Sequence, residues 1–487
     1  MKRILLILIL GVNSNVFSQQ NNLESYISFP FSTGFTTDES GKAIAWTTNV
    51  MGIRNIYLNN NNRTTQLTKY QADDGQEISN LTLTQDGKIL LFVRGGAPNV
   101  KGANPNPASL SEAQKMAIYG VNTSGGEPFL IALGGNFKIA SGGNKLLINK
   151  GGRIHEILIQ PNASSNELFY DRGAISDFSE SPDGQEILFT SERGDHSFIG
   201  IYNRASKSIR WIAPEINHDQ FPVWSPDGKQ IAFIRMPGTK NGGLSNLTAG
   251  YRYELIVANA ETGDFSKIWT SPDPSGGFVH SYPHPAISWN RFGKILFFSE
   301  HTGWSHLWAI NPDGTGLTDL SPGDGEVESF TENKNEPVVY FDSNIGDINR
   351  RHIWQANLVS GKSTMITKGE GIEMHPVTSG KDVYCFRSGY NFSRTLARID
   401  QDGKSFTDLK ISADNFQSNL FIKPEAVVFK AADGTTIHGQ LFINRNMKGK
   451  KPGLLYMHGG PTRQMLLGFH YSDYYSQCYA FNQFMAQ

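Results

Sequence analysis

The sequence predicts a mainly β protein, in which a seven- or eight-bladed β-propeller is followed by the first elements of an α/β domain. Two observations predict it. A unit of glycine-centred turns and short alternating strands repeats between about residue 36 and residue 400, as expected of propeller blades. An apolar run then enters a His-Gly-Gly turn near residue 458. A chain of 487 residues is too long to fold around one hydrophobic core of ordinary size, so two or more domains are expected.

Residues 1–18 are predicted to be a signal peptide. Lys2 and Arg3 precede the apolar run 4–10, and Ser18 supplies a small residue at the cleavage position. The run is too short to span a bilayer as a helix. A buried N-terminal strand is the alternative interpretation of the same residues. The signal peptide predicts a periplasmic or secreted protein without a membrane span.

The clearest copies of the repeat contain the tetrapeptide Ser-Pro-Asp-Gly. Residues 181–184 lead into the alternating run 186–190, and residues 225–228 lead into the apolar run 231–234. The Asp-Gly pair suits a tight turn because glycine adopts positive φ, and the β-branched and aromatic residues that follow suit a half-buried strand. Each copy therefore predicts a hairpin at the start of a blade.

Eight turns of this kind mark the repeat. The intervals between them are 46, 56, 41, 44, 65, 42 and 45 residues. Eight markers predict eight blades, and seven remains open because the unit around Gly143 is weak. The two long intervals contain the insertions 97–115 and 237–250, which are predicted to be loops, either functional or decorative. The markers are residues 41, 87, 143, 184, 228, 293, 335 and 380.

A second domain is predicted from residue 421 to residue 487, after a propeller of residues 36–415. A hairpin surrounds Asp433-Gly434, and a basic turn and Pro452 separate it from the apolar run 453–457, predicted to be a buried strand. Hairpin, buried strand and glycine turn are how an α/β-hydrolase sheet begins. Residues 471–487 are predicted to form an amphipathic helix, because four apolar residues recur at helical spacing. They are Tyr474, Cys478, Phe481 and Met485.

This order of motifs resembles the prolyl oligopeptidase and dipeptidyl-peptidase family of serine peptidases, in its exported bacterial members. The resemblance is carried by the Ser-Pro-Asp-Gly propeller, the hairpin 433–439 and the turn 458–461, and it covers essentially the whole chain. It implies a propeller that gates access to a hydrolase domain, and cleavage of peptides, commonly after proline or another small residue. Ser-Pro-Asp-Gly alone is weak, since TolB-like propellers without activity contain it too.

The glycine turn is the candidate oxyanion hole. Backbone N–H groups at the end of a buried strand can stabilise the negative oxygen of a tetrahedral acyl intermediate. By the resemblance, His458 occupies the place of an oxyanion-donating tyrosine, and the N–H groups of Gly459 and Gly460 are alternative donors. A turn needed only for strand-to-helix geometry is the competing interpretation.

The nucleophile is missing from this sequence. It contains no Gly-x-Ser-x-Gly motif, the elbow on which this fold carries its serine. We expect the serine, the acid and the histidine of the triad beyond residue 487, so the chain is predicted to be a truncated, inactive part of a serine peptidase. A non-enzymatic TolB-like propeller that binds a protein or peptide partner is the alternative function.

Glu326 and Glu328 are the candidate substrate-binding residues. Exopeptidases of the resembled family hold a free amino terminus with paired propeller carboxylates, and these two lie in the link 323–328 between blades. The competing interpretation is that the spacing of two residues only reflects the alternation of side chains along the edge of a strand. The choice between exopeptidase and endopeptidase therefore stays open.

Several other functions are not predicted. A net charge of −1, from 44 basic and 45 acidic residues, argues against a nucleic-acid partner. The histidines lack the spacing of a zinc motif, and no calcium-binding Asp ladder is present, so neither a metal nor a cofactor is expected. The two cysteines, Cys385 and Cys478, are predicted to be free thiols rather than a disulfide. Residues 350–354 are predicted to pack between blades.

Overall fold

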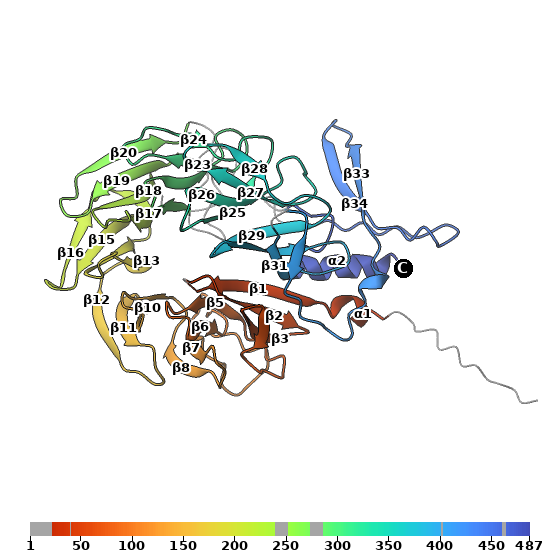
Figure 1. The fold of residues 1–487 in the computed structure, drawn as a ribbon, viewed down its shortest axis with the longest axis horizontal. Helices are drawn as coiled ribbons and strands as arrows, with labels where there is room; N and C mark the ends of the chain where they lie inside the picture. Colours follow the sequence, from red (N-terminus) through yellow and green to blue (C-terminus); the bar gives the residue numbers. More distant parts are fainter. Residues whose placement is uncertain (1–21, 39, 239–251, 273–285, 401–402, 460–463) are drawn as a thin grey trace, which may run out of the picture.

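Eight four-stranded antiparallel sheets follow one another along the chain in the computed structural model (Figure 1). The structure describes residues 22–38, 40–238, 252–272, 286–400, 403–459 and 464–487. Each sheet is one blade, built from one continuous segment, and a single parallel bridge between Ser197 and His218 joins the fourth sheet to the fifth. The mainly β propeller is thereby confirmed, with eight blades in the described residues.

The first four blades contain strands 1 to 16. They are β1 (Pro30–Thr37), β2 (Ala43–Val50), β3 (Ile53–Asn60) and β4 (Arg63–Gln66); β5 (Ile78–Leu83), β6 (Ile89–Arg94), β7 (Ala117–Asn122) and β8 (Phe129–Leu133); β9 (Phe137–Ile139), β10 (Lys145–Lys150), β11 (Arg153–Leu158) and β12 (Ser165–Tyr170); β13 (Ala174–Glu180), β14 (Glu186–Glu192), β15 (Ser197–Asn203) and β16 (Ser208–Ile212).

The last four blades contain strands 17 to 32. They are β17 (Asn217–Trp224), β18 (Gln230–Pro237), β19 (Glu254–Asn259) and β20 (Phe265–Thr270); β21 (Ile287–Trp289), β22 (Ile295–Ser299), β23 (His306–Ile310) and β24 (Thr318–Asp319); β25 (Val327–Glu332), β26 (Val338–Ser343), β27 (His352–Asn357) and β28 (Ser363–Met365); β29 (Ile372–Ser379), β30 (Asp382–Ser388), β31 (Thr395–Ile399) and β32 (Phe406–Asp408).

All eight predicted turn markers lie between the first and second strands of a blade. In the fourth blade, Asp183 Oδ1 accepts hydrogen bonds from Ser181 Oγ at 2.6 Å and from the Gln185 amide at 3.1 Å, and Gly184 has a φ of +72°. The copy around Asp227 has the same bonds, at 2.7 and 3.1 Å. The Ser-Pro-Asp-Gly motif is thus a self-contained turn, with the positive φ that glycine allows.

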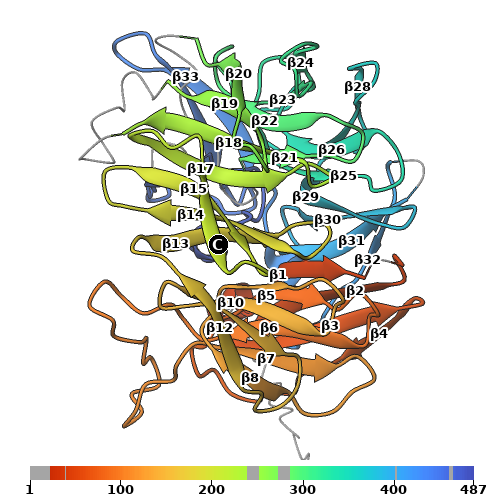
Figure 2. The same ribbon diagram turned by 90° about the vertical axis from the view of Figure 1, so that its left-hand side faces the viewer.

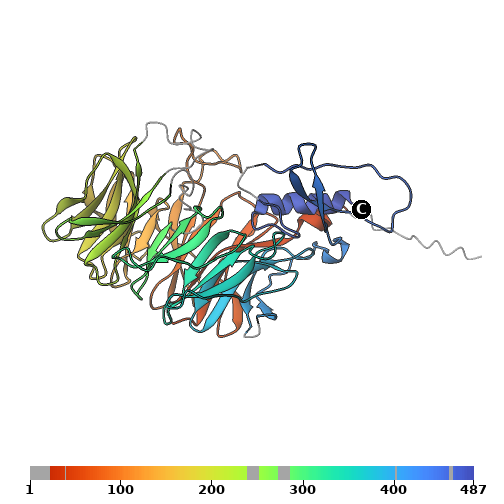
Figure 3. The same cartoon turned by 90° about the horizontal axis from the view of Figure 1, so that it is seen from above.

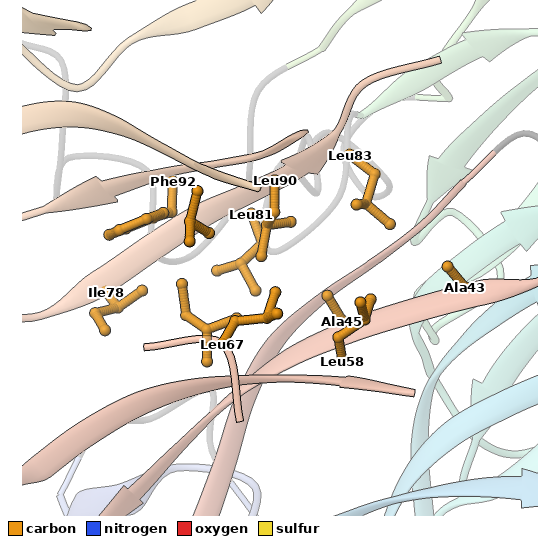
Figure 4. Close-up of a cluster of buried hydrophobic side chains, with 11 residues drawn as sticks. Ala43, Ala45, Leu58, Leu67, Ile78, Leu81, Leu83, Leu90 and Phe92 are labelled. Carbon is orange, nitrogen blue, oxygen red and sulfur yellow. The ribbon is translucent and has the colours of Figure 1, made fainter. Parts of the chain in front are cut away.

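Apolar side chains fill the space between neighbouring blades. The cluster between the first and second blades includes Ala45, Leu58, Leu90 and Phe92, all buried (Figure 4). Comparable clusters lie at each of the next six blade-to-blade contacts. Trp354 packs in one of them, as predicted, and Cys385 in another as a free thiol. The fan of strands in Figure 2 is therefore held by side chains between the sheets.

The ring closes where the first blade meets the eighth (Figure 1). Ile44 and Trp46 of β2 pack against Phe386 of β30 and Leu396 of β31. The Ser32 amide also donates to the carbonyl of Arg394 at 3.0 Å. Because the strands of both blades come from separate continuous segments, side-chain packing rather than a shared sheet makes this seam.

The described residues of the second domain form few elements. Beside a 3₁₀ turn (Ser418–Leu420) they are the hairpin β33 (Glu425–Lys430) and β34 (Thr436–Leu441) and helix α2 (Asp473–Met485). Hairpin and helix are confirmed as predicted. No helix in the described part of the chain is long and apolar enough to cross a membrane.

Residues at the start of the chain join the second domain. Helix α1 (Glu24–Ile27) lies beside α2, as Figures 1 and 3 show. One buried cluster collects aromatic residues from both ends of the sequence, with T-shaped and tilted ring contacts. The first blade is thereby tethered to the helix that follows the propeller. The large buried members of this terminal cluster are Tyr26, Phe29, Phe31, Phe421, Phe469 and Tyr479.

The predicted buried strand 453–457 is wrong for this structure. These residues are neither a strand nor buried, and Leu455 is 83% exposed. A strand is stable only when neighbours satisfy its backbone groups, and no described strand pairs with this run. The exposed face of α2 carries Tyr474, Phe481 and Met485, so the predicted apolar stripe faces away from the core while Tyr475 and Tyr479 are buried.

We expect the seam to be a weak point of the ring. Leu396→Ala should cost about 2–5 kcal/mol, because it leaves a cavity in the closing cluster. Leu158→Ala, at an exposed leucine of β11, is the control and should be nearly neutral. Thermal unfolding measures both, and equal melting temperatures for the two variants would contradict the role of the seam.

Candidate functional site

Residues 464–472, between the glycine turn and α2, seat the second domain on the seventh and eighth blades. The Leu467 amide donates to the Asn349 carbonyl at 3.1 Å, and the Phe469 amide donates to the Gly389 carbonyl at 3.0 Å. A Cβ on Gly468 would lie 2.8 Å from backbone atoms of Gly389, so only glycine allows this approach. The contact is therefore close and largely made by the backbone. We call residues 464–472 the docking segment.

Glu326 and Glu328 lie together where the docking segment meets the seventh blade. Both pair with Arg351, whose side chain is 1% exposed. Arg351 Nη2 is 2.9 Å from Glu326 Oε1, and Arg351 Nε donates to Glu328 Oε1 at 2.7 Å. Burial, followed by the charge of Glu328, raises the pKa of Glu326. Two carboxylates thus share one guanidinium, and the three groups sum to one negative charge when both are ionised.

A third carboxylate lies beneath this pair. Asp342 of β26 is fully buried, and it accepts hydrogen bonds from the amides of Ser329 at 2.9 Å and His375 at 2.7 Å. Burial, followed by the charge of Glu328, raises the pKa of Asp342 to about 7. Because Ser329 belongs to β25 and His375 to β29, Asp342 joins the inner strands of the seventh and eighth blades.

His352, which follows Arg351 in the sequence, is buried between two further carboxylates. Its Nδ1 lies 2.9 Å from Glu373 Oε2, and its Nε2 lies 3.7 Å from Asp347 Oδ2. Burial disfavours the charged ring, but the hydrogen bonds to Asp347 and Glu373 outweigh burial and raise the pKa of His352 to about 9. His352 is therefore a cation at neutral pH, and it balances part of the acidic charge of this face.

The predicted oxyanion residues lie on the second domain. His458 and Gly459 are exposed, and the hydroxyl of Tyr475 in α2 donates to the Gly459 carbonyl at 2.8 Å. Gly460 lies outside the described residues. Five residues after Gly459, Gln464 Oε1 accepts a hydrogen bond from Arg351 Nη1 at 2.9 Å. The structure thus links the carboxylate pair to the segment that follows the turn.

Two residues of this arrangement could not be singled out in advance. Arg351 stands in a run predicted to serve blade packing, and Gln464 stands in a polar stretch without a motif. The available signal was a Glu-x-Glu pair followed within one blade by Arg350-Arg351, since buried carboxylates need cationic partners. Their contact joins different domains, and no local pattern records such a contact.

Comparison with known proteins relates the chain to propeller-containing peptidases. Residues 251–389 match the family model described as the dipeptidyl peptidase IV (DPP IV) N-terminal region. The chain is 29% identical over 167 residues to dipeptidyl-peptidase 5 of Porphyromonas gingivalis, across 32% of this chain and 22% of the relative. These matches confirm the resemblance to the prolyl oligopeptidase and dipeptidyl-peptidase family.

Solved structures share the fold at low identity. Porphyromonas gingivalis dipeptidyl peptidase 4 gives a TM-score of 0.60 at 11% identity, over 84% of this chain and 64% of that chain. A Mycobacterium tuberculosis puromycin-hydrolyzing peptidase gives 0.56 at 13% identity, over 95% of this chain and 65% of that one. The chain therefore spans about two thirds of the length of these structures.

Protonation of His352 should make stability depend on pH. Its folded pKa of about 9 exceeds the usual 6.5, so its contribution is complete below about pH 6.5 and is lost as the pH rises through 9. We expect His352→Gln to lower the melting temperature at pH 6, by an effect of no more than about 3 kcal/mol, and to matter little at pH 10.

Thermal unfolding of wild type and variant across this pH range measures the effect. His438→Gln, in the exposed part of β34, is the matched control. A difference between wild type and His352→Gln that stays constant from pH 6 to pH 10 would contradict a charged His352.

Proposed function

We propose that this chain is the propeller and the leading part of the hydrolase domain of an exported serine peptidase, which cleaves peptides through an acyl-enzyme. The observation that carries the proposal is the seating of the docking segment beside Glu326 and Glu328. It is the place where a peptide held by the propeller would meet a hydrolase domain. The match of residues 251–389 to a dipeptidyl-peptidase propeller region supports the same function.

Glu326 and Glu328 are proposed to bind the free amino group of a peptide. After pairing with Arg351, the two carboxylates retain one negative charge, which suits one protonated amine. The site is largely buried, so a charge-assisted hydrogen bond there is stronger than one at an exposed surface. Access through the propeller would restrict substrates to peptides and unfolded segments.

The turn 458–460 is proposed to become an oxyanion hole once a complete sheet supports it. Three of the residues that precede it are well exposed: Leu454, Leu455 and Met457, at 63%, 83% and 80%. Together with the exposed face of α2 they offer an apolar surface of the kind that a hydrolase sheet and its helices cover. Tyr456 contacts Cys478 of α2, so the apolar run 453–457 lies beside this helix.

The catalytic serine is proposed to lie outside this sequence, because none of its serines has the elbow motif. The DNA after codon 487 tests this directly. A Gly-x-Ser-x-Gly motif, in frame or after one frameshift, within about a hundred codons would support the peptidase. Its absence would favour a propeller that binds a partner. Export is proposed from residues 1–18, which lie outside the described residues.

The chain by itself should be inactive. We expect purified residues 19–487 to show no amidase activity on proline-containing chromogenic peptides and no labelling by a fluorophosphonate probe, because the sequence has no Gly-x-Ser-x-Gly elbow to carry a nucleophilic serine. A propeller-only protein is the control for nonspecific labelling. Labelling above that control would identify a nucleophile in this sequence and refute the proposed truncation.

In an enzyme completed with its serine, the double variant Glu326→Gln, Glu328→Gln should raise KM for peptides with a free amine at least about tenfold, as expected when charge-assisted hydrogen bonds are lost. N-acetylated peptides should be unaffected, because they carry no positive charge. Steady-state kinetics on matched free and acetylated peptides measure this. An equal rise of KM for both peptides would contradict amine binding.

A further inference from the structure

Arg351 makes hydrogen bonds to two separate parts of the molecule. Its Nε and Nη2 reach the carboxylates of Glu328 and Glu326, which belong to the propeller. Its Nη1 donates to Gln464 Oε1 at 2.9 Å, and Gln464 is the first residue of the docking segment. The guanidinium is a planar fork with fixed donor directions, so a movement of either set of acceptors strains the other.

Gln464 is itself held on both sides. Its Nε2 donates to the Ile348 carbonyl in the loop before Arg351. Its own carbonyl lies 3.1 Å from Nε2 of His470, whose Nδ1 accepts the amide of Ser472 at 2.9 Å. Since Nδ1 is an acceptor, Nε2 carries the proton and donates to Gln464.

Ser472 directly precedes α2, and the Ser476 hydroxyl closes this path by donating to the His470 carbonyl at 2.7 Å. A continuous series of hydrogen bonds therefore runs from the propeller carboxylates through Arg351 to the first turn of α2. Tyr475 of that turn binds the Gly459 carbonyl. Gly459 and Gln464 are thus both held by hydrogen bonds to residues at or just before the start of α2.

We propose that Arg351 is a positioning residue, which couples the carboxylate pair Glu326 and Glu328 to the docking segment through Gln464. It thereby fixes the separation between the amine-binding carboxylates and Gly459. The functional consequence of this coupling rests on the proposed function: in a peptidase, that separation would set how many residues lie between a bound amino group and the cleaved bond. The coupling itself is a property of this chain and does not need activity.

The test is hydrogen exchange on the whole chain, followed in the docking segment. The double variant Glu326→Gln, Glu328→Gln changes side chains of the propeller alone, yet it should raise exchange in the docking segment about tenfold, within the usual range of coupling between sites. Glu332→Gln is the matched control, since Glu332 is a half-buried carboxylate of β25, the strand of Glu328, and bonds to Ser288. It should leave the segment unchanged.

Substitutions at Gln464 provide the reciprocal measurement. Gln464→Met keeps the length but removes the acceptor, so exchange should rise both in the docking segment and at residues 326–329. Gln464→Glu retains an acceptor for Arg351 and should restore the protection of residues 326–329. Combined with Gln464→Met, the double glutamine variant should add nothing further in the docking segment, because the link is already broken.

The proposal is overturned if the double variant and Glu332→Gln give the same exchange rate in the docking segment. It is also overturned if the double variant raises that rate by the same factor in the presence of Gln464→Met as in its absence. Exchange in β6 and β10, far from the site, reports whether each variant is folded. Should the double variant fail to fold, the Gln464 variants alone decide, through residues 326–329. A coupling without peptidase activity in the completed enzyme would refute the proposed function only, whereas activity without coupling would refute the role of Arg351 only.

Discussion

Packing between the first and the eighth blade is the contact on which the architecture depends. A ring of sheets in which every blade is one continuous segment has no strand shared by its first and last blades. Side-chain packing, with the backbone hydrogen bond from Ser32 to Arg394, therefore holds the two ends of the ring together. The terminal cluster adds a second closure above the seam, since Phe29 and Phe31 precede or begin the first blade while Phe469 lies in the docking segment. The second domain therefore contributes to the integrity of the propeller and is more than an appendage of it.

The same face of the propeller concentrates buried charge. Carboxylates from the start of β25 and from β26 approach one another, and the Glu373 carboxylate of β29 is buried beside His352. Burying these charges is costly unless cations accompany them. Arg351 and a protonated His352 supply that compensation, and each contacts groups from more than one element. Stability and site geometry are consequently linked here, because the cations that neutralise the acidic groups also decide where these groups lie relative to the second domain.

Most of the fold could be predicted from local sequence. Asp183 and Asp227 organise turns whose bonds lie within five residues, so the period follows from motifs alone. The choice of eight blades over seven required the structure, because the motif around Gly143 is weak. The prediction of a buried strand at 453–457 was wrong because a strand forms only when other strands pair with it, and a local sequence pattern does not contain those strands. For the site, Glu326 and Glu328 could be proposed from spacing, but Arg351 and Gln464 could not, since their contact spans 113 positions of sequence.

The terminal cluster also constrains how the protein is made. Tyr26 and Tyr479 share one core although 453 positions separate them (479 − 26). A ribosome adding about 5–20 residues per second needs roughly 20 to 90 seconds to span that distance. During this interval the first blade has neither its last neighbour nor its aromatic cover, so nascent chains expose Phe29, Phe31 and Trp46 to solvent and to chaperones until the eighth blade and α2 have been made.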